Sequence, residues 1–446
     1  MKYIILLFLA PTIILGQKNI SMQLDEYMNA QADIYNFSGV VLVKSHNKIV
    51  LEKAYGLADR EWNIPNTLDT KYNLCSITKQ FTATSILQLD ELGKLNVNDK
   101  LYKYLPDFPN SEKVTIHMML THTSGITDYT ELPQYYDWLY ALDISKDSII
   151  SILKTKPFDF EPGTSYKYSS SNYYLLAYVV EMVTKQNRSF FLKDHIFNKA
   201  GMINTGVDTP DTILLKRAKS YLFSEGKYIS AETERVSNTF GTGDIFSTVE
   251  DLNKWDNALL GKDILSNGSK FRMYMPVKEN YGYGIICIPI ENKTCIQHSG
   301  SGAGFSNSFL RIPSDSSCVI VLSNNASQSP SISFALATII LGGHVKTPKI
   351  HTEIKQNSKN FHNYTGQYEG MFIGFPSKLK IIEKSDKLYV YVNGVEDIEI
   401  KAESPTRFYY ANGTDKQIEF ELDSKGKVIN LWRLVYGLKV QLKKRE

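Results

Sequence analysis

Ser76 and Lys79 stand three residues apart in Ser76-Ile77-Thr78-Lys79, and together they could carry out acyl transfer. On a helix this spacing places both side chains on one face, one turn apart. A helix N-terminus at Ser76 would favour negative charge there. Partial removal of Lys79 from water would lower its affinity for a proton, so that it could accept the serine proton. The pair therefore predicts a serine nucleophile with a lysine as its proton partner.

The S-x-x-K pattern is weak evidence by itself, because the chain contains it at six serines: Ser45, Ser76, Ser151, Ser224, Ser377 and Ser424. Ser76 differs from the others in its place. It follows a short extended segment, Tyr72 to Leu74, and opens a run that stops at Gly93 and has apolar residues at Ile77, Phe81, Ile86, Leu87 and Leu89. That run predicts a buried helix from Ser76 to Leu92. From the pattern alone, an N-cap serine beside a solvent-facing lysine is the alternative interpretation.

Longer segments resemble the serine β-lactamases and penicillin-binding proteins, in the branch of class C β-lactamases and secreted D-alanyl-D-alanine carboxypeptidases. Five segments carry the resemblance in the family's order: YNLCSITKQFTATSILQLDELGKLNVNDKLYKYLPDFP (72–109), VTIHMMLTHTSG (114–125), EPGTSYKYSSSNYYLL (161–176), GTGDIFSTVEDL (241–252) and QHSGSGAGFSNSFLRIPSDSSCVIVLSN (297–324). The resemblance implies a β-lactamase/transpeptidase-like fold of the α/β (α+β) class. Such a fold has an antiparallel sheet flanked by helices, with a helical subdomain.

The family's three catalytic motifs can be placed on this chain. The resemblance implies that Ser76 is the nucleophile and Lys79 its proton partner. The second motif, usually Tyr-x-Asn, matches Tyr168-Ser169-Ser170, which implies an acid–base role for Tyr168. Because a nearby ammonium lowers a phenol's proton affinity, we expect Lys79 and Tyr168 to share the proton transfers.

The third motif, usually Lys-Thr-Gly or His-x-Gly, matches His298-Ser299-Gly300, which the resemblance places in substrate binding. The resemblance also implies an oxyanion hole formed by the backbone N–H groups of Ser76 and Ser301. Donors at such a hole stabilise the negative charge that develops on the substrate oxygen.

Two departures from the family pattern concern the substrate. Ser170 replaces the asparagine whose amide contacts the substrate's acylamino group in the family, and it offers one hydroxyl instead. Asn172, two residues further on, should face elsewhere. His298 stands where a lysine would be a permanent cation, and an imidazole is mostly neutral at pH 7. Both departures favour a peptidase or esterase over an efficient β-lactamase.

Other reactive residues have structural interpretations. The segment His122-Thr123-Ser124-Gly125 looks catalytic, but the resemblance makes it a structural loop. Cys75, beside the predicted nucleophile, is interpreted as a small buried residue. Cys287 and Cys295 flank a predicted turn at Glu291, so a cross-strand disulfide is an open alternative in an oxidising compartment.

The composition limits the classes of function. The chain has 446 residues, 43% hydrophobic and 22% charged, with a formal net charge of +3. These values exclude disorder as the main state, and the near-balanced charge argues against a nucleic-acid partner. Four cysteines without a C-x-x-C pair and scattered histidines predict no metal site, and we expect no cofactor.

The order of predicted elements gives the domain organisation. Residues 1–16 are predicted to be a signal peptide, with an uncleaved anchor as the alternative. A helix is expected at 22–35, a hairpin at 39–55, a β-rich stretch at 281–322 and a helix at 332–341.

The hydrolase domain is thus predicted at 17–345, a linker at 346–360 and a small antiparallel β domain, resembling a lipocalin-like module, at 361–446. We expect a periplasmic or secreted serine hydrolase that forms an acyl-enzyme on peptide, amide or ester substrates. The alternative is an inactive protein of the same fold that binds peptidoglycan or peptides. No stable membrane span is expected, and the sequence leaves the oligomeric state open.

Overall fold

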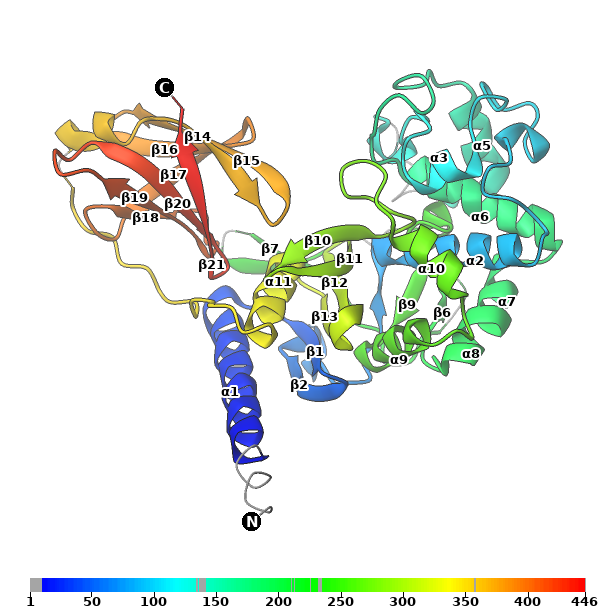
Figure 1. Cartoon of the computed structure of the whole chain (residues 1–446), viewed down its shortest axis with the longest axis horizontal. Coiled ribbons are helices and arrows are strands. Elements are labelled where there is room, and N and C mark those ends of the chain that lie inside the picture. The colour runs from blue at the N-terminus through cyan, green and yellow to red at the C-terminus, as the bar shows by residue number, and fades with distance from the viewer. Residues whose placement is uncertain are drawn as a thin grey trace, which may run out of the picture. The chain divides into compact units, whose positions relative to one another are not determined.

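The computed structural model in Figure 1 describes residues 10–133, 135, 142–209, 211, 213–224, 226–231, 235–356 and 358–445. The chain divides into two compact units. One unit contains residues 38–288 and 293–333, and the other contains the chain up to residue 37, residues 289–292 and the chain from residue 334 onward. The predicted boundaries 17–345, 346–360 and 361–446 stay predictions.

A six-stranded antiparallel sheet organises the first unit, in the order β10-β11-β12-β13-β1-β2. Its strands are β1 (Gly39–Ser45), β2 (Lys48–Tyr55), β10 (Ile286–Ile290), β11 (Lys293–Gly302), β12 (Phe305–Ile312) and β13 (Ser317–Ser323). The run Val40 to Val43 is buried, and β1 is an interior strand that pairs with β13 on one side and β2 on the other. The predicted hairpin at 39–55 and the β-rich stretch at 281–322 are both confirmed.

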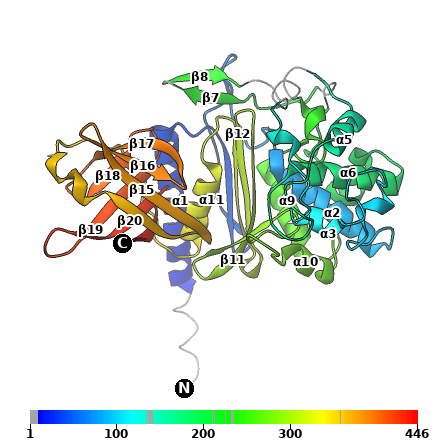
Figure 2. The same ribbon diagram turned by 90° about the horizontal axis from the view of Figure 1, so that it is seen from above.

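Helices cover this sheet and form a separate cluster around α2 and α6 (Figures 1 and 2). They are α2 (Thr78–Glu91), α3 (Ile116–Leu120), α5 (Lys146–Lys154), α6 (Ser170–Thr184), α7 (Arg188–Leu192), α8 (Asn198–Ala200), α9 (Val249–Leu260) and α10 (Asn267–Tyr274). Short strands complete the unit: β3 (Leu57–Asp59), β4 (Ile64–Pro65), β5 (Tyr72–Asn73), β6 (Gly206–Val207), β7 (Tyr221–Ser224), β8 (Lys227–Ser230) and β9 (Ile245–Ser247). Helix α9 packs on β13 and β1.

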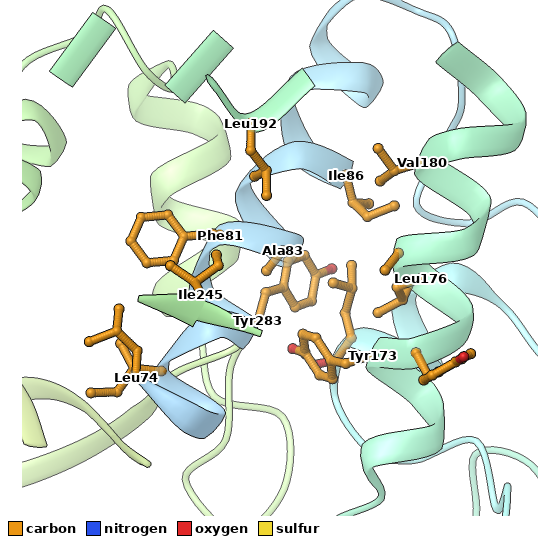
Figure 3. Close-up of a cluster of buried hydrophobic side chains, with 14 of the residues drawn as sticks. Leu74, Phe81, Ala83, Ile86, Tyr173, Leu176, Val180, Leu192, Ile245 and Tyr283 are labelled. Atoms are coloured by element: carbon orange, nitrogen blue, oxygen red, sulfur yellow. The ribbon is translucent and has the colours of Figure 1, made fainter. Parts of the chain in front are cut away.

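Helix α2 runs through the core of this unit, and its residues 78–89 are all buried. In Figure 3, Ile86 of α2 faces Val180 of α6. The helix ends where predicted, with Gly93 in the left-handed region at φ +65° just after it. A helix packed on all sides holds its first turn rigidly, and that turn carries Lys79.

The second unit contains a closed antiparallel barrel of eight strands in sequential order. They are β14 (Gly366–Phe372), β15 (Phe375–Lys384), β16 (Lys387–Val392), β17 (Val395–Ala402), β18 (Arg407–Tyr410), β19 (Lys416–Leu422), β20 (Val428–Val435) and β21 (Leu438–Lys444). Tyr368, Phe408, Phe420 and Leu431 belong to the cluster of buried side chains in this barrel. The predicted small antiparallel β domain is confirmed as a closed barrel.

Helix α1 and most of helix α11 belong to this unit. Helix α1 (Ala10–Tyr35) includes the predicted helix at 22–35, and its Tyr27 hydroxyl donates to the carbonyl of Tyr436, 2.9 Å away. Helix α11 (Ser329–Ile340), predicted at 332–341, begins in the first unit. Residues 1–9 of the predicted signal peptide lie outside the described residues. Within the described part of the chain, none of the helices has the length and apolar character needed to cross a membrane.

None of the four cysteines forms a disulfide bond in the part of the chain that the structure describes. The Cys287–Cys295 disulfide, left open by the sequence, is therefore absent: Cys295 is buried, and the Cys287 thiol lies 3.1 Å from the carbonyl oxygen of Tyr274, to which it donates. Cys75 is buried, as predicted.

Candidate active site

Ser76 lies in a tight 3-10 turn, Cys75–Ile77, which leads directly into α2. The regular helix thus begins at Thr78, two residues later than predicted. Cys75 adopts a left-handed backbone conformation, φ +49°, and its N–H donates to Oδ1 of Asn73 at 2.8 Å. A non-glycine residue in this region is strained, and such strain is found most often at functional sites. The turn leaves the Ser76 side chain half-buried at the start of the core helix.

The side-chain nitrogen of Lys79 contacts the Ser76 hydroxyl. Lys79 is fully buried, and its Nζ donates to Ser76 Oγ at 2.9 Å and to the carbonyl oxygen of Thr242 at 3.2 Å. These two acceptors fix the long side chain in one position. The S-x-x-K spacing thus places a nitrogen base within hydrogen-bond distance of a hydroxyl.

Tyr168 lines the same cavity as Ser76, and the Ser76 side chain is near enough to influence the pKa of its phenol. Burial raises the pKa of the Tyr168 phenol well above its ordinary value, the Ser76 side chain opposes the rise, and the charge of Asp128 adds to it. The net shift of the Tyr168 pKa is therefore upward, because burial dominates it. Lys79 Nζ lies 5.0 Å from the centre of the phenol ring, and the expected sharing of the proton transfers stays a prediction.

His122 is bonded to both neighbours of Tyr168 in the chain. Its Nδ1 accepts the Ser169 N–H at 3.1 Å, and its carbonyl accepts the Lys167 N–H at 3.1 Å. An accepting Nδ1 places the proton of this imidazole on Nε2, and burial lowers the pKa of His122 well below its ordinary value. The loop predicted to be structural thus holds the segment that carries Tyr168. Asn172, as predicted, faces elsewhere and bonds Ser124 Oγ at 2.6 Å.

Strand β11 passes directly beside the turn that carries Ser76. A Cβ on Gly300 would lie 2.0 Å from the carbonyl oxygen of Leu74 and 3.0 Å from the Ser76 nitrogen. No side chain fits there, so glycine is required for β11 to approach this closely. The third motif thus brings Ser301 to the nucleophile, because Ser301 follows Gly300 on the same strand.

His298, at the first position of that motif, has both ring nitrogens occupied. Nδ1 lies 2.6 Å from the carbonyl oxygen of Ser299, so it must donate, and Nε2 accepts from the hydroxyl of Tyr281 at 3.0 Å. Burial and, to a smaller extent, the charge of Lys79 lower the pKa of His298 to about 3, and the bond to Ser299 opposes the shift. The predicted neutral imidazole is confirmed, and it packs inside the site instead of facing the cavity.

A cavity of about 540 Å³ opens above the Ser76 hydroxyl. Five predicted site residues line it: Ser76, Lys79, Tyr168, Ser170 and Ser301. The other three, His298, Ser299 and Gly300, are not among the residues that line the cavity. The lining also includes the carboxylates of Asp128 and Glu131, which sequence reasoning did not select.

Asp128 is bonded to the second motif. Its Oδ2 accepts the N–H of Ser170 at 2.9 Å, and its Oδ1 accepts the N–H of Thr130 at 3.0 Å. Burial raises the pKa of Asp128, and these hydrogen bonds oppose the rise. No spacing in the sequence links Asp128 to Ser170, 42 residues later, so only the folded chain reveals the pair.

The comparisons with known proteins agree with this geometry. The Beta-lactamase family profile matches residues 24–339. Penicillin-binding protein 4* of Bacillus subtilis (strain 168) is 28% identical over 422 residues, which cover 87% of this chain and 91% of that protein. D-aminopeptidase of Brucella anthropi is 27% identical over 315 residues, 68% of this chain and 59% of that protein.

Among solved structures, a penicillin-binding protein from Bacillus halodurans superimposes with a TM-score of 0.63 at 27% identity. The match covers 70% of this chain and 98% of that structure. The catalytic fold is thus the one that the resemblance implied. This chain belongs to the Beta-lactamase family and is a serine hydrolase.

Proposed function

We propose that this protein is an exported hydrolase that forms an acyl-enzyme on Ser76 and acts on peptide, amide or ester substrates. The observation that carries the proposal is the 2.9 Å contact from Lys79 Nζ to Ser76 Oγ, in a cavity that Tyr168 also lines. An inactive binding protein would have no need of a buried lysine and a buried phenol around one serine. The relatedness to a D-aminopeptidase supports a hydrolytic role on small substrates.

In the acylation step, the uncharged amine of Lys79 takes the proton of Ser76 as Oγ bonds to the substrate carbonyl carbon. The carbonyl oxygen becomes negative, and the N–H groups of Ser76 and Ser301 donate to it. Tyr168 keeps its proton until this point, because burial holds its pKa high. It then gives that proton to the leaving nitrogen or oxygen, and Lys79 returns a proton to the phenolate.

In the deacylation step, water replaces the leaving group. Lys79 accepts a proton from the water as its oxygen attacks the ester carbon, and the same proton returns to Ser76 Oγ as the acid product leaves. Each cycle restores the starting proton on Ser76, Lys79 and Tyr168. One water is consumed, and one amide or ester bond is broken.

The third motif supports an amide or ester substrate over a β-lactam. A β-lactam carries a carboxylate that would pair with a permanent cation near the site. His298 is neutral, and both of its nitrogens are engaged within the protein. It can hold β11 in place, but it offers no charge to a substrate.

Mass spectrometry of the intact protein after reaction with a fluorophosphonate tests the acyl-enzyme. We expect one adduct on the wild type and none on Ser76→Ala. Ser151→Ala is the matched control, because Ser151 opens the same S-x-x-K pattern on α5 yet is exposed. An adduct that persists on Ser76→Ala, or none on the wild type, would overturn the proposal.

A substrate panel tests the preference. We expect faster turnover of p-nitrophenyl esters and of D-alanyl amides or peptides than of nitrocefin. Rapid nitrocefin hydrolysis would show that the departures at Ser170 and His298 do not disfavour β-lactams.

A further inference from the structure

Two consecutive carbonyl groups lie against α2 beside the predicted nucleophile. The carbonyl oxygen of Thr242 accepts from Lys79 Nζ at 3.2 Å. The carbonyl oxygen of Gly241, one residue earlier, accepts from the Thr82 hydroxyl at 2.8 Å. Lys79 and Thr82 are three residues apart, so their side chains lie on one face of the helix. One helix face thus fixes two neighbouring peptide groups.

Residues 241–245, which we call the 241–245 segment, are also bonded to the start of α2 at their far end. The N–H of Ile245 donates to Thr78 Oγ1 at 3.2 Å, and the Ile245 carbonyl accepts the N–H of Leu74 at 2.8 Å. The segment runs antiparallel to this part of the chain, and Thr242 is one of the residues that line the catalytic cavity. The position of the Thr242 carbonyl therefore depends on how the 241–245 segment is held.

The hydroxyl of Thr82 differs in direction from the two hydroxyls that follow it on α2. A serine or threonine inside a helix often donates to the carbonyl four residues before it. Thr84 and Ser85 do so, with the carbonyl oxygens of Gln80 at 2.8 Å and Phe81 at 2.9 Å. Thr82 instead donates to a residue 159 positions later in the chain. Its hydroxyl therefore stabilises the 241–245 segment and not its own helix.

The backbone at Gly241 gives this hydrogen bond a specific role. Gly241 is left-handed, with φ +70°, and a Cβ there would lie 2.2 Å from the Cβ of Ala177 on α6. The position thus requires glycine, the residue with the widest choice of backbone conformations. A buried ion pair of Arg188 with Asp244 anchors the other end of the segment. At the glycine end, the Thr82 hydroxyl restrains rotation of the peptide group.

We propose that Thr82 is a positioning residue for the removal of the Ser76 proton. Its hydroxyl fixes the Gly241 carbonyl, and the next carbonyl, that of Thr242, then holds Lys79 Nζ at Ser76 Oγ. Thr82 is fully buried and is not among the residues that line the catalytic cavity, so it acts through the backbone. The inference rests on the proposed acyl-enzyme at Ser76 and deepens it.

The rate at which a fluorophosphonate labels Ser76 tests the proposal. The phosphorus bonds to Ser76 Oγ and fluoride leaves, so the hydroxyl proton must be taken up in the same reaction. Thr82→Val keeps the shape of the side chain and removes its hydroxyl. We expect this variant to be labelled about 10- to 100-fold more slowly, since a reacting group misplaced by about 1 Å can cost that much. Its final extent of labelling should equal that of the wild type.

Thr84→Val is the matched control. Thr84 is a fully buried threonine on the same helix, and its hydroxyl makes a bond of equal length inside α2. This variant should be labelled within about threefold of the wild-type rate, as expected for a site outside the chemistry. Thr82→Ser, which retains the hydroxyl, should also stay within this range. Equal rates in Thr82→Val and Thr84→Val, or a rate in Thr82→Ser as low as in Thr82→Val, would overturn the inference.

Two further readouts separate positioning from loss of structure. A misfolded fraction would lower the final extent of labelling and leave the rate unchanged, and that result in Thr82→Val would contradict the positioning role. Steady-state kinetics on a p-nitrophenyl ester should show a fall in kcat with KM within about threefold, because only the chemical step is slowed. If the valine variants fold poorly, Thr82→Ala and Thr84→Ala provide the same comparison.

The design distinguishes this inference from the proposed function. If the fluorophosphonate does not label Ser76 in the wild type, the acyl-enzyme fails, and the inference that rests on it fails as well. If the wild type is labelled and Thr82→Val is labelled as fast as Thr84→Val, only the positioning role of Thr82 fails.

Discussion

The imidazole of His122 lies against the phenol of Tyr168, with their ring centroids 4.4 Å apart and their planes inclined by 34°. The same histidine bonds the backbone N–H groups of Ser169 and Lys167 on either side of that tyrosine. One residue thereby fixes both the backbone and the ring that we propose for proton transfer. His122 is absent from the cavity wall, so it acts through Tyr168 as a positioning residue.

Replacement of His122 by alanine should lower kcat by about 10- to 100-fold with little change in KM, because a displaced acid–base group slows the chemical step. His122→Asn should retain more activity. Its side-chain oxygen can accept the Ser169 N–H, and asparagine tolerates the left-handed backbone at φ +56°. Steady-state kinetics on a p-nitrophenyl ester measures both variants.

The control for His122 is His117→Ala. His117 bonds the Tyr283 hydroxyl at 2.7 Å, and no ring contact or hydrogen bond to Tyr168 is present. It should leave kcat within about threefold of the wild type, as expected for a site outside the chemistry. Equal losses in His122→Ala and His122→Asn would argue against the positioning role.

Tyr168→Phe removes the phenolic proton and keeps the ring. We expect kcat to fall by about 100-fold or more, which is typical for the loss of a general acid. Tyr166→Phe is the comparison, because Tyr166 is a nearby tyrosine whose ring lies 6.2 Å from His122. Near-normal turnover in Tyr168→Phe would remove the phenol from the mechanism.

The sequence predicted the part of this site that depends on residues close together in the chain. Ser76 and Lys79 share one helical turn, and both belong to the segment that the sequence predicted as a buried helix. The contacts of His122 with Tyr168, and of Asp128 with Ser170, join segments more than 40 residues apart. Their positions depend on how the loops fold over α6, which no residue pattern encodes. The net direction of the Tyr168 pKa could not be predicted either, because the depth of burial decides it.

The same limit applies to the fold. The barrel strands at Lys378 to Ile382 and Arg407 to Tyr410 could be read from alternating side chains, and both are present. Closure of the barrel by β14 and β21 was not predicted, because it pairs Tyr368 with Lys444 at opposite ends of the domain.

Gly300→Ala should abolish most of the activity. The added Cβ would lie 2.0 Å from the Leu74 carbonyl oxygen, so β11 must move away from the Ser76 turn. Displacement of one oxyanion donor is expected to lower kcat by about 100-fold or more. Gly268→Ala on α10 is the control, because its Cβ would meet only an ordinary contact with Ser266 Oγ at 3.7 Å. Full activity in Gly300→Ala would mean that the strand tolerates the shift.

His298 should make the protein less stable in acid. Its pKa is about 3 in the folded chain, against an ordinary value near ~6.5 in the unfolded chain. Between these values the unfolded chain binds a proton that the folded chain does not, so the free energy of unfolding falls as the pH falls. Each such histidine contributes a slope of about 1.4 kcal/mol per pH unit within this window.

His122 acts in the same direction, whereas the raised pKa of Asp128 acts in the opposite one, so a variant must be compared with the wild type. His298→Gln removes one titrating group. Urea unfolding at pH 7, 6, 5 and 4 should therefore show a shallower decline for this variant than for the wild type. Identical slopes for His298→Gln and the wild type would mean that His298 takes up its proton in the folded protein as readily as in the unfolded chain.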